Sequence, residues 1–204
     1  MNAKLILLAF VLTQGTLQSE PHAPSLSSRE SLSLTLRRSN SELSSLAHGQ
    51  GRYIAVGQTG LILSSPDGRN WIHEDSGTTA SLRSVVFGQR LFVAVGNLGT
   101  ILTSPNGQRW TLRGSKDYPC LASVVHAKGL FVAVGENGGI FTSPDGVKWS
   151  RRESGTSARL RSVGFGAKRF IAVGTGGGHP QFERWGALES TLLGNHTGLE
   201  KRVL

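Results

Sequence analysis

The stretch LRSVVFGQRLFVAVGNLGTILTSPNGQRWTLRG, residues 82–114, decides the fold of this chain. It holds four short segments rich in β-branched and aromatic residues, separated by Gly, Pro and Asn. We expect strands at 82–88, 91–96, 100–104 and 109–113. No segment has apolar residues at helical spacing over a comparable length. The stretch therefore predicts a unit of four short antiparallel strands.

The same unit recurs along the chain at a fixed spacing. The tripeptide Ala-Val-Gly recurs every 39 residues, and its glycines are Gly57, Gly96, Gly135 and Gly174. Three tryptophans keep the same interval: Trp71, Trp110 and Trp149. A fixed period of about 40 residues is typical of repeat architectures, and four strands per repeat indicate one propeller blade. We therefore predict an all-β fold, a β-propeller of four-stranded antiparallel blades.

The repeat does not run to the end of the chain. Three units are complete, and a fourth begins at Leu160 and loses the pattern after Gly177, so the propeller portion is predicted at 43–177. Closed propellers have about four to eight blades, so we expect an incomplete ring of about three and a half. Read one base out of frame, the codons allowed for 178–204 restore repeat residues in register. We interpret this tail as a frameshift product, and we expect self-association through open blade edges.

The N-terminus has the pattern of a signal peptide, which we assign to residues 1–19. Lys4 precedes an apolar core, Leu5–Leu12, that is too short to span a bilayer. We expect a secreted, periplasmic or cell-surface protein with no membrane span. Residues 20–42 are Ser-rich and predict a linker, in which 32–38 lies in register with a fourth strand that would close the ring.

Composition excludes several classes of function. The single cysteine, Cys120, rules out an internal disulfide framework, and no repeat places a catalytic partner beside it. The net charge of +9 is spread over the repeats as single Lys and Arg residues. A solvated basic surface is the simpler interpretation, and attraction to anionic glycans or cell envelopes is the alternative. Without a nucleotide loop, zinc spacing or nucleic-acid motif, we expect no cofactor, no metal and no nucleic-acid partner.

The turns SSPDGRNW (64–71), TSPNGQRW (103–110) and TSPDGVKW (142–149) resemble the Asp-box of BNR-repeat propellers. That family's pattern is roughly S-x-D-x-G-x-x-W, and here Asp67 and Gly68 are adjacent, so the box is one residue shorter. The wider pattern AVGxxGxIxxSPDGxxW is also similar to propellers of the photosystem II assembly factor type and to exported bacterial propellers. The resemblance implies the fold and says little about function.

The chemistry of these turns favours a structural role. Asp and Asn oxygens accept hydrogen bonds from turn amides, Gly supplies positive φ, and Trp packs a large apolar surface. A metal-ligand role is weaker, because the equivalent residues lie in different blades. We assign the structural role to Ser65, Asp67, Gly68, Trp71, Ser104, Asn106, Gly107, Trp110, Ser143, Asp145, Gly146 and Trp149.

Sialidases also carry Asp-boxes, so a fragment of a sialidase-like glycoside hydrolase is the enzyme alternative. That resemblance implies three arginines, a Tyr–Glu nucleophile pair and an acidic general acid. Here the tyrosines are Tyr53 and Tyr118, the Phe-Arg-Ile-Pro type motif is absent, and no carboxylate pair is evident. A third alternative is a non-functional frameshifted product.

Binding groups usually lie on loops held by a rigid scaffold. In each blade, the turn between the second and third strands and the connection to the next blade are expected on one rim. Arg83 and Arg161 begin first strands near the expected central channel, although repeat-consensus residues with solvent or backbone contacts are the simpler interpretation. The candidate binding residues are Arg83, Arg161, Asn97, Glu136, Asn137, Asp117 and Tyr118. The leading prediction is a non-enzymatic binding or scaffold module for an unknown protein or glycan.

Overall fold

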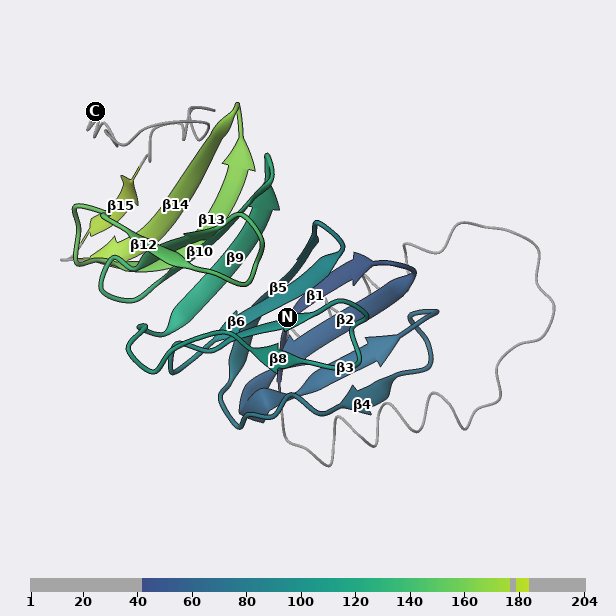
Figure 1. Cartoon of the computed structure of the whole chain (residues 1–204). Coiled ribbons are helices and arrows are strands. Elements are labelled where there is room, and N and C mark those ends of the chain that lie inside the picture. The colour runs from purple at the N-terminus through teal and green to yellow at the C-terminus, as the bar shows by residue number, and fades with distance from the viewer. Residues whose placement is uncertain (1–41, 177–178, 184–204) are drawn as a thin grey trace.

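The computed structural model describes residues 42–176 and 179–183 and consists of four antiparallel sheets in chain order (Figure 1). Three sheets have four strands each, paired in sequence order, and the fourth has three. The structure therefore confirms the predicted all-β fold with four-stranded antiparallel blades. The predicted signal peptide, the linker up to residue 41 and most of the tail lie outside the described residues.

The strand bounds repeat with the sequence. The first blade contains β1 (Leu43–Gly49), β2 (Arg52–Gly57), β3 (Ile62–Ser65) and β4 (Ile72–Glu74), with a single 3-10 turn, η1 (Gln58–Gly60). The second contains β5 (Leu82–Gly88), β6 (Leu91–Gly96), β7 (Ile101–Ser104) and β8 (Thr111–Leu112). The third contains β9 (Leu121–Ala127), β10 (Leu130–Gly135), β11 (Ile140–Ser143) and β12 (Ser150–Arg152). The fourth contains β13 (Arg159–Gly166), β14 (Arg169–Gly176) and β15 (His179–Glu183).

The outermost strand of the second blade is shorter than the predicted 109–113 and spans only Thr111–Leu112. The reason lies in the preceding turn. The amide of Arg109 donates to Asn106 Oδ1 at 3.2 Å, so it is used by the turn. The ladder with β7 therefore begins two residues later than the sequence pattern indicates.

The apolar core lies between neighbouring blades. Alternate residues of each strand face opposite sides of a sheet, so every inner blade buries one face on the blade before it and the other on the blade after it. Between the first and second blades, Ile54 and Val56 pack with Leu82 and Phe92, all fully buried. Equivalent clusters join the second blade to the third and the third to the fourth. The first strands β1, β5, β9 and β13 contact one another in series and form the inner edge.

A hydrogen bond repeats at each of the three seams between blades. A serine hydroxyl of one first strand accepts the amide proton of a valine in the next. The pairs are Ser45–Val85 at 3.1 Å, Ser84–Val124 at 3.2 Å and Ser123–Val163 at 3.3 Å. Because a hydrogen bond is directional, this repeated bond adds to apolar packing in fixing the register between blades.

The fourth sheet has an open outer face. Ile171 is 39% exposed, whereas the residues at the same repeat position, Ile54, Val93 and Val132, are 0%, 0% and 3% exposed. Each of those three is covered by the following blade, and within the described residues no further blade follows Ile171. This open face fits the incomplete propeller that the repeat count predicts, and self-association through it stays a prediction.

The third strand of the fourth sheet does not follow the repeat register. In the third blade, Val134 pairs with Ile140, six residues further on. In the fourth sheet, Val173 pairs with Phe182, nine residues further on. The strand β15 lies beyond the predicted end of the repeat. Its different register agrees with the loss of the repeat pattern in the sequence after Gly177.

The seam between the second and third blades contains a histidine, His126, where two of the other three blades have phenylalanine. His126 lies at the end of β9 against Gly88, where a Cβ would collide with the imidazole. Within the described part of the chain its Nε2 atom is buried and has no hydrogen-bond partner, and burial lowers its pKa. Phe87 and Phe165 occupy the same repeat position. The imidazole therefore brings an unsatisfied polar atom into an apolar contact.

We expect His126→Phe to raise the free energy of unfolding at pH 7 by about 1 kcal/mol, because it removes an unsatisfied buried nitrogen. Since the folded pKa of His126 is lowered, protons bind the unfolded chain more strongly, and wild-type stability falls as pH drops below the unfolded value of about 6.5. The substitution should flatten that dependence. Urea unfolding between pH 5 and 8 measures both effects, with His48→Phe, at the equivalent exposed position, as the control. A variant less stable than wild type at pH 7 would contradict this interpretation of the seam.

Candidate functional site

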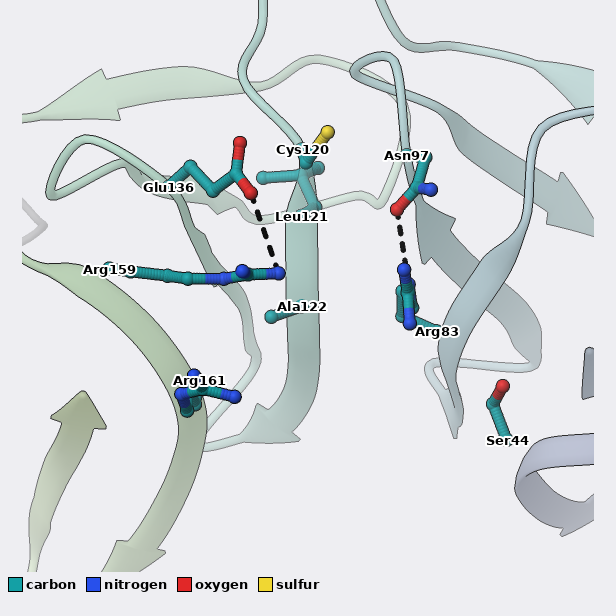
Figure 2. Close-up of a pocket in the computed structure, with 9 residues that line it drawn as sticks. All are labelled: Ser44, Arg83, Asn97, Cys120, Leu121, Ala122, Glu136, Arg159 and Arg161. Atoms are coloured by element: carbon teal, nitrogen blue, oxygen red, sulfur yellow. Dashed lines mark hydrogen bonds and ion pairs between the residues drawn. The ribbon is translucent and has the colours of Figure 1, made fainter. Parts of the chain in front are cut away.

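A hollow of about 240 Å³ opens at the inner edge of the sheets, and we call it the inner hollow (Figure 2). All four blades contribute, through first strands β1, β5, β9 and β13, the residue preceding β9 and the turns that follow β6 and β10. Its lining residues are Ser44, Arg83, Asn97, Cys120, Leu121, Ala122, Glu136, Arg159 and Arg161. The inner hollow is therefore built mainly from strands and short turns, which hold its side chains on a rigid frame.

Four of the lining residues share one repeat position: Ser44, Arg83, Ala122 and Arg161. At each of them the pairing between the first and second strands shifts by one residue, as between Leu82 and Ser84. Such a β-bulge leaves the extra residue outside the ladder and redirects its side chain. Because the first strands lie side by side, the four bulges bring these side chains to one place. Arg83 and Arg161 are thus gathered by the fold.

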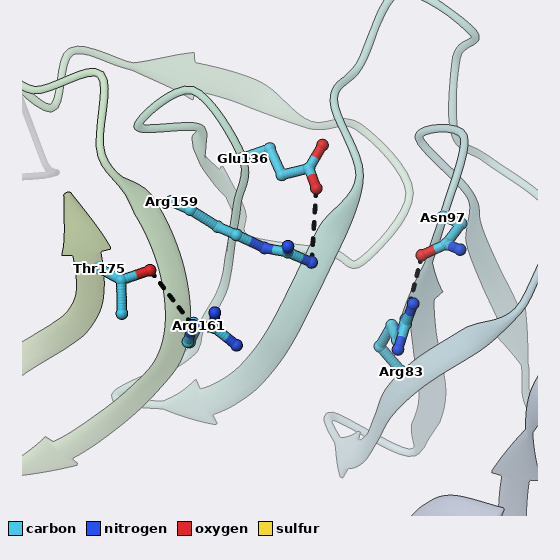
Figure 3. A network of polar contacts seen from close by, with 6 residues as sticks. All are labelled: Arg83, Asn97, Glu136, Arg159, Arg161 and Thr175. Atoms are coloured by element: carbon cyan, nitrogen blue, oxygen red, sulfur yellow. Dashed lines mark hydrogen bonds and ion pairs between the residues drawn. The ribbon is translucent and has the colours of Figure 1, made fainter. Parts of the chain in front are cut away.

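Arg83 and Arg161 are each held by a neutral residue of their own blade (Figure 3). Arg83 Nε donates to Asn97 Oδ1 at 3.0 Å, and Arg161 Nε donates to Thr175 Oγ1 at 3.3 Å. Asn97 and Thr175 occupy the same repeat position. Among the described residues, these are the only hydrogen bonds of the two guanidinium groups. Their terminal nitrogens therefore remain available to an acceptor in the inner hollow.

Arg159 makes a different contact, across the seam between the third and fourth blades. One of its terminal nitrogens lies 3.4 Å from Glu136 Oε1 (Figure 3). The two side chains are 47% and 38% exposed, so solvent weakens the pair and its net worth is at most about 1 kcal/mol. In the third blade, Ala122 stands where Arg83 and Arg161 stand in theirs. Glu136 therefore has no such arginine in its own blade and pairs with the next one.

The inner hollow carries three guanidinium groups and one carboxylate, a formal charge of +2 (three minus one). Arginine binds carboxylate and phosphate groups with two parallel hydrogen bonds, and it keeps its charge throughout the physiological pH range. A concave surface with charge of one sign concentrates counter-ions from solution. The arrangement can therefore hold an anionic group.

The structure divides the predicted binding residues into two sets. Arg83, Arg161, Asn97 and Glu136 line the inner hollow, and Asn137, Asp117 and Tyr118 do not. The ring of Tyr118 packs on Phe141 with centroids 4.5 Å apart. Asp117 accepts a hydrogen bond from Ser115 Oγ at 3.1 Å. Asn137 adopts a positive φ of 54° in the turn after β10. These three have packing or turn contacts of their own.

Sequence reasoning missed Arg159, Cys120, Ser44 and Leu121 as lining residues. Arg159 begins the strand that also carries Arg161, but the β-bulge at Arg161 interrupts the alternation of faces, so spacing alone did not predict that both side chains reach the inner hollow. Ser44 occupies the same repeat position as Arg83, so the 39-residue spacing could have identified it as a lining residue. Nothing in the sequence marks Cys120, which lines the inner hollow because the connection from the second blade ends there.

The three Ser-Pro-Asp/Asn-Gly turns contribute no residue to the inner hollow. In the first, Asp67 Oδ1 accepts the amides of Arg69 and Asn70, both at 2.8 Å, and Trp71 Nε1 donates to the Gly68 carbonyl at 3.1 Å. The other two turns repeat this pattern around Asn106 and Asp145. These contacts fit the structural role assigned from the sequence.

Hydrogen bonds within the first turn lower the pKa of Asp67. Partial burial alone would raise the pKa of Asp67, but two turn amides and the side chains of Asn70 and Ser65 outweigh it and lower the pKa to about 2. At Asp145, hydrogen bonds from the amides of Lys148 and Val147 likewise lower the pKa. Both carboxylates are therefore ionised and bound to their own turns at neutral pH.

We expect Asp67→Ala to lower the free energy of unfolding by about 1–2 kcal/mol, since two amides of the turn lose their acceptor. The wild-type contribution is present above the unfolded pKa of 3.8 and is lost as pH falls toward the folded value of about 2. Asp67→Asn, which copies Asn106, should keep most of the stability and lose that acid dependence. Urea unfolding at pH 7 and at pH 3 measures both, and an Ala variant as stable as wild type would contradict the assigned role.

The lining of the inner hollow also bears on the hydrolase alternative. Of its nine residues, Glu136 alone is a carboxylate, and neither tyrosine is among them. Two-carboxylate glycoside hydrolysis needs a pair of acids, one on each side of the glycosidic bond.

Within residues 42–176 and 179–183, no cluster of three or more His, Cys, Asp or Glu residues could hold a metal ion. Across those residues, no helix has the length and apolarity to cross a membrane.

Comparisons with solved structures identify proteins of similar fold. No family model and no curated protein matches the chain. The chain is similar to the computationally designed Ika4 protein, with 15% identity over 66% of this chain and 86% of that one and a TM-score of 0.55. It is also similar to YCF48 bound to D1 peptide, with 22% identity over 68% and 48% of the two chains and a TM-score of 0.52. A chain of the nidogen–laminin complex matches with 14% identity over 65% and 56% and a TM-score of 0.54.

These likenesses and the four sheets define the chain as a β-propeller, incomplete as predicted. The chain spans about half the length of the YCF48 and nidogen–laminin chains it matches, at 48% and 56%. At such identities the likeness shows the fold alone. The narrower resemblance to Asp-box propellers stays a prediction.

Proposed function

We propose that this chain is a non-enzymatic protein-binding module whose inner hollow receives an acidic segment of a partner protein. The observation that carries the proposal is the convergence of Arg83, Arg159 and Arg161 from two blades on one hollow that contains a single carboxylate. Similar propellers include one solved with D1 peptide bound and one in a nidogen–laminin complex, which supports a protein partner.

The size of the inner hollow suits a side chain or a chain terminus. Its volume of about 240 Å³ is below the roughly 300–1,000 Å³ of pockets that enclose drug-sized ligands. An acidic side chain or a terminal carboxylate therefore enters it, and the rest of the segment lies along the rim. As part of the same proposal, the module acts outside the cytoplasm, on the strength of the leader-like sequence at 1–19.

Fluorescence anisotropy with labelled peptides tests the proposal on the full chain. A Glu-rich peptide should bind with a dissociation constant on the order of 10 µM, and the matched peptide with Gln for Glu should not. Affinity should fall with salt, since charges at a partly open site are screened. Equal binding of the two peptides, or none to either, would overturn the proposal. An acidic monosaccharide that binds while both peptides fail would instead favour the glycan alternative.

A further inference from the structure

We propose that Glu136 is an internal competitor that occupies Arg159 until an anionic ligand displaces it. This inference rests on the proposed function and adds a regulatory contact to the same site. The observation behind it is the ion pair itself, in which a carboxylate of the protein already sits 3.4 Å from one of the three guanidinium groups of the inner hollow.

The repeat shows that this carboxylate is not part of the common framework. Its equivalents are Gln58, Asn97 and Thr175, all neutral. Asn97 and Thr175 hold an arginine through Nε and leave its terminal nitrogens to the inner hollow. Glu136 instead contacts a terminal nitrogen, the part of a guanidinium that would bind a ligand carboxylate.

The third blade also differs from its neighbours at the position opposite the turn that carries Glu136. Where Arg83 and Arg161 stand in the second and fourth blades, the third blade has Ala122, so Glu136 reaches across the seam to Arg159. Both partners remain partly exposed, at 47% and 38%, so exchange of Glu136 for another carboxylate requires no opening of the core.

Two effects follow for the ligand. An entering carboxylate must replace Glu136 on Arg159, which lowers its net gain, and it also meets the repulsion of the displaced acid. Glu136 is the only carboxylate among the nine lining residues, so these effects come from one side chain. A single isolated carboxylate is therefore discriminated against, and a segment with several acidic groups, which engages Arg83 and Arg161 together, is accepted.

The test compares Glu136→Gln with wild type in binding of the Glu-rich peptide. Because an exposed ion pair is worth up to about 1 kcal/mol, Glu136→Gln should bind the peptide about two- to fivefold more tightly. The gain should become smaller in an Arg159→Gln background, because Glu136 then has no guanidinium to occupy and only its repulsion of the ligand remains. Glu153→Gln removes the same charge at an exposed position outside the inner hollow and should change affinity little.

The outcomes separate the two proposals. Wild type that binds the peptide, together with a Glu136→Gln variant that binds equally or less tightly, overturns the competitor role and leaves the proposed function standing. Failure of both proteins to bind overturns the proposed function itself. Glu136→Asn copies the residue at position 97 and gives a second reading if the Gln variant is poorly folded.

Discussion

Replacing Gly60 with alanine should lower the free energy of unfolding by about 3 kcal/mol, more than any other single change proposed for this protein. Gly60 has φ of 74°, a left-handed conformation that costs a residue with a Cβ about 1–2 kcal/mol. The added Cβ would also collide with the Thr78 carbonyl oxygen and lie 2.8 Å from Ser76 Oγ. That loop is itself bonded, Ser76 Oγ to the Thr78 carbonyl at 3.1 Å, so it cannot easily retreat.

Gly77→Ala provides the matched control, because Gly77 has φ of 67° and nothing within 4 Å of the added Cβ. It should lose only the conformational term, about 1 kcal/mol. Urea unfolding of the two variants separates backbone conformation from close approach. Equal losses would show that the turn after β2 does not depend on its contact with the connection between blades.

The largest effect on binding should come from removing two arginines together. We expect Arg83→Gln/Arg161→Gln to weaken binding of the acidic peptide about 30-fold, because each guanidinium supplies charge-assisted hydrogen bonds that are partly discounted by solvent. Anisotropy at low salt measures the change. The glutamines keep a donor for Asn97 and Thr175, so the strands that carry them should remain in place.

Arg69→Gln/Arg109→Gln is the control for net charge. Both arginines lie in the Ser-Pro-Asp/Asn-Gly turns, outside the inner hollow, and only their backbone amides bond to the turns. This pair removes the same charge and should weaken binding only slightly. If the two double variants lose affinity equally, the peptide responds to overall charge, and the inner hollow is not its site.

The sequence predicted the elements that depend on the repeated backbone. The strands Leu82–Gly88 and Leu91–Gly96 have the predicted bounds, because alternating apolar residues and the turns between them determine both ends. Arg83 and Arg161 were predicted to lie near the inner edge because each stands at the start of the first strand of its blade. The β-bulge at each of these arginines redirects its side chain, and the repeat pattern in the sequence does not predict it.

The rest of the candidate site depends on contacts between blades, which a repeat pattern does not contain. Glu136 was selected from the sequence as a rim residue, but its pairing with Arg159 follows from the presence of Ala122 across the turn. Tyr118 and Asp117 were selected as residues of a connection between blades. A position in such a connection does not distinguish a side chain exposed for binding from one packed inward, and Tyr118 packs against Phe141.

Alkylation of Cys120 tests whether the inner hollow is where an acidic segment binds. Cys120 is the only cysteine of the chain, it lines the inner hollow and it is partly buried. The rate of its alkylation by iodoacetamide, followed by mass spectrometry, should fall as the Glu-rich peptide is added, in proportion to the bound fraction measured by anisotropy. The Gln-substituted peptide should leave the rate unchanged. A peptide that binds to saturation while Cys120 reacts at its original rate would show that the acidic segment binds elsewhere on the protein, outside the inner hollow.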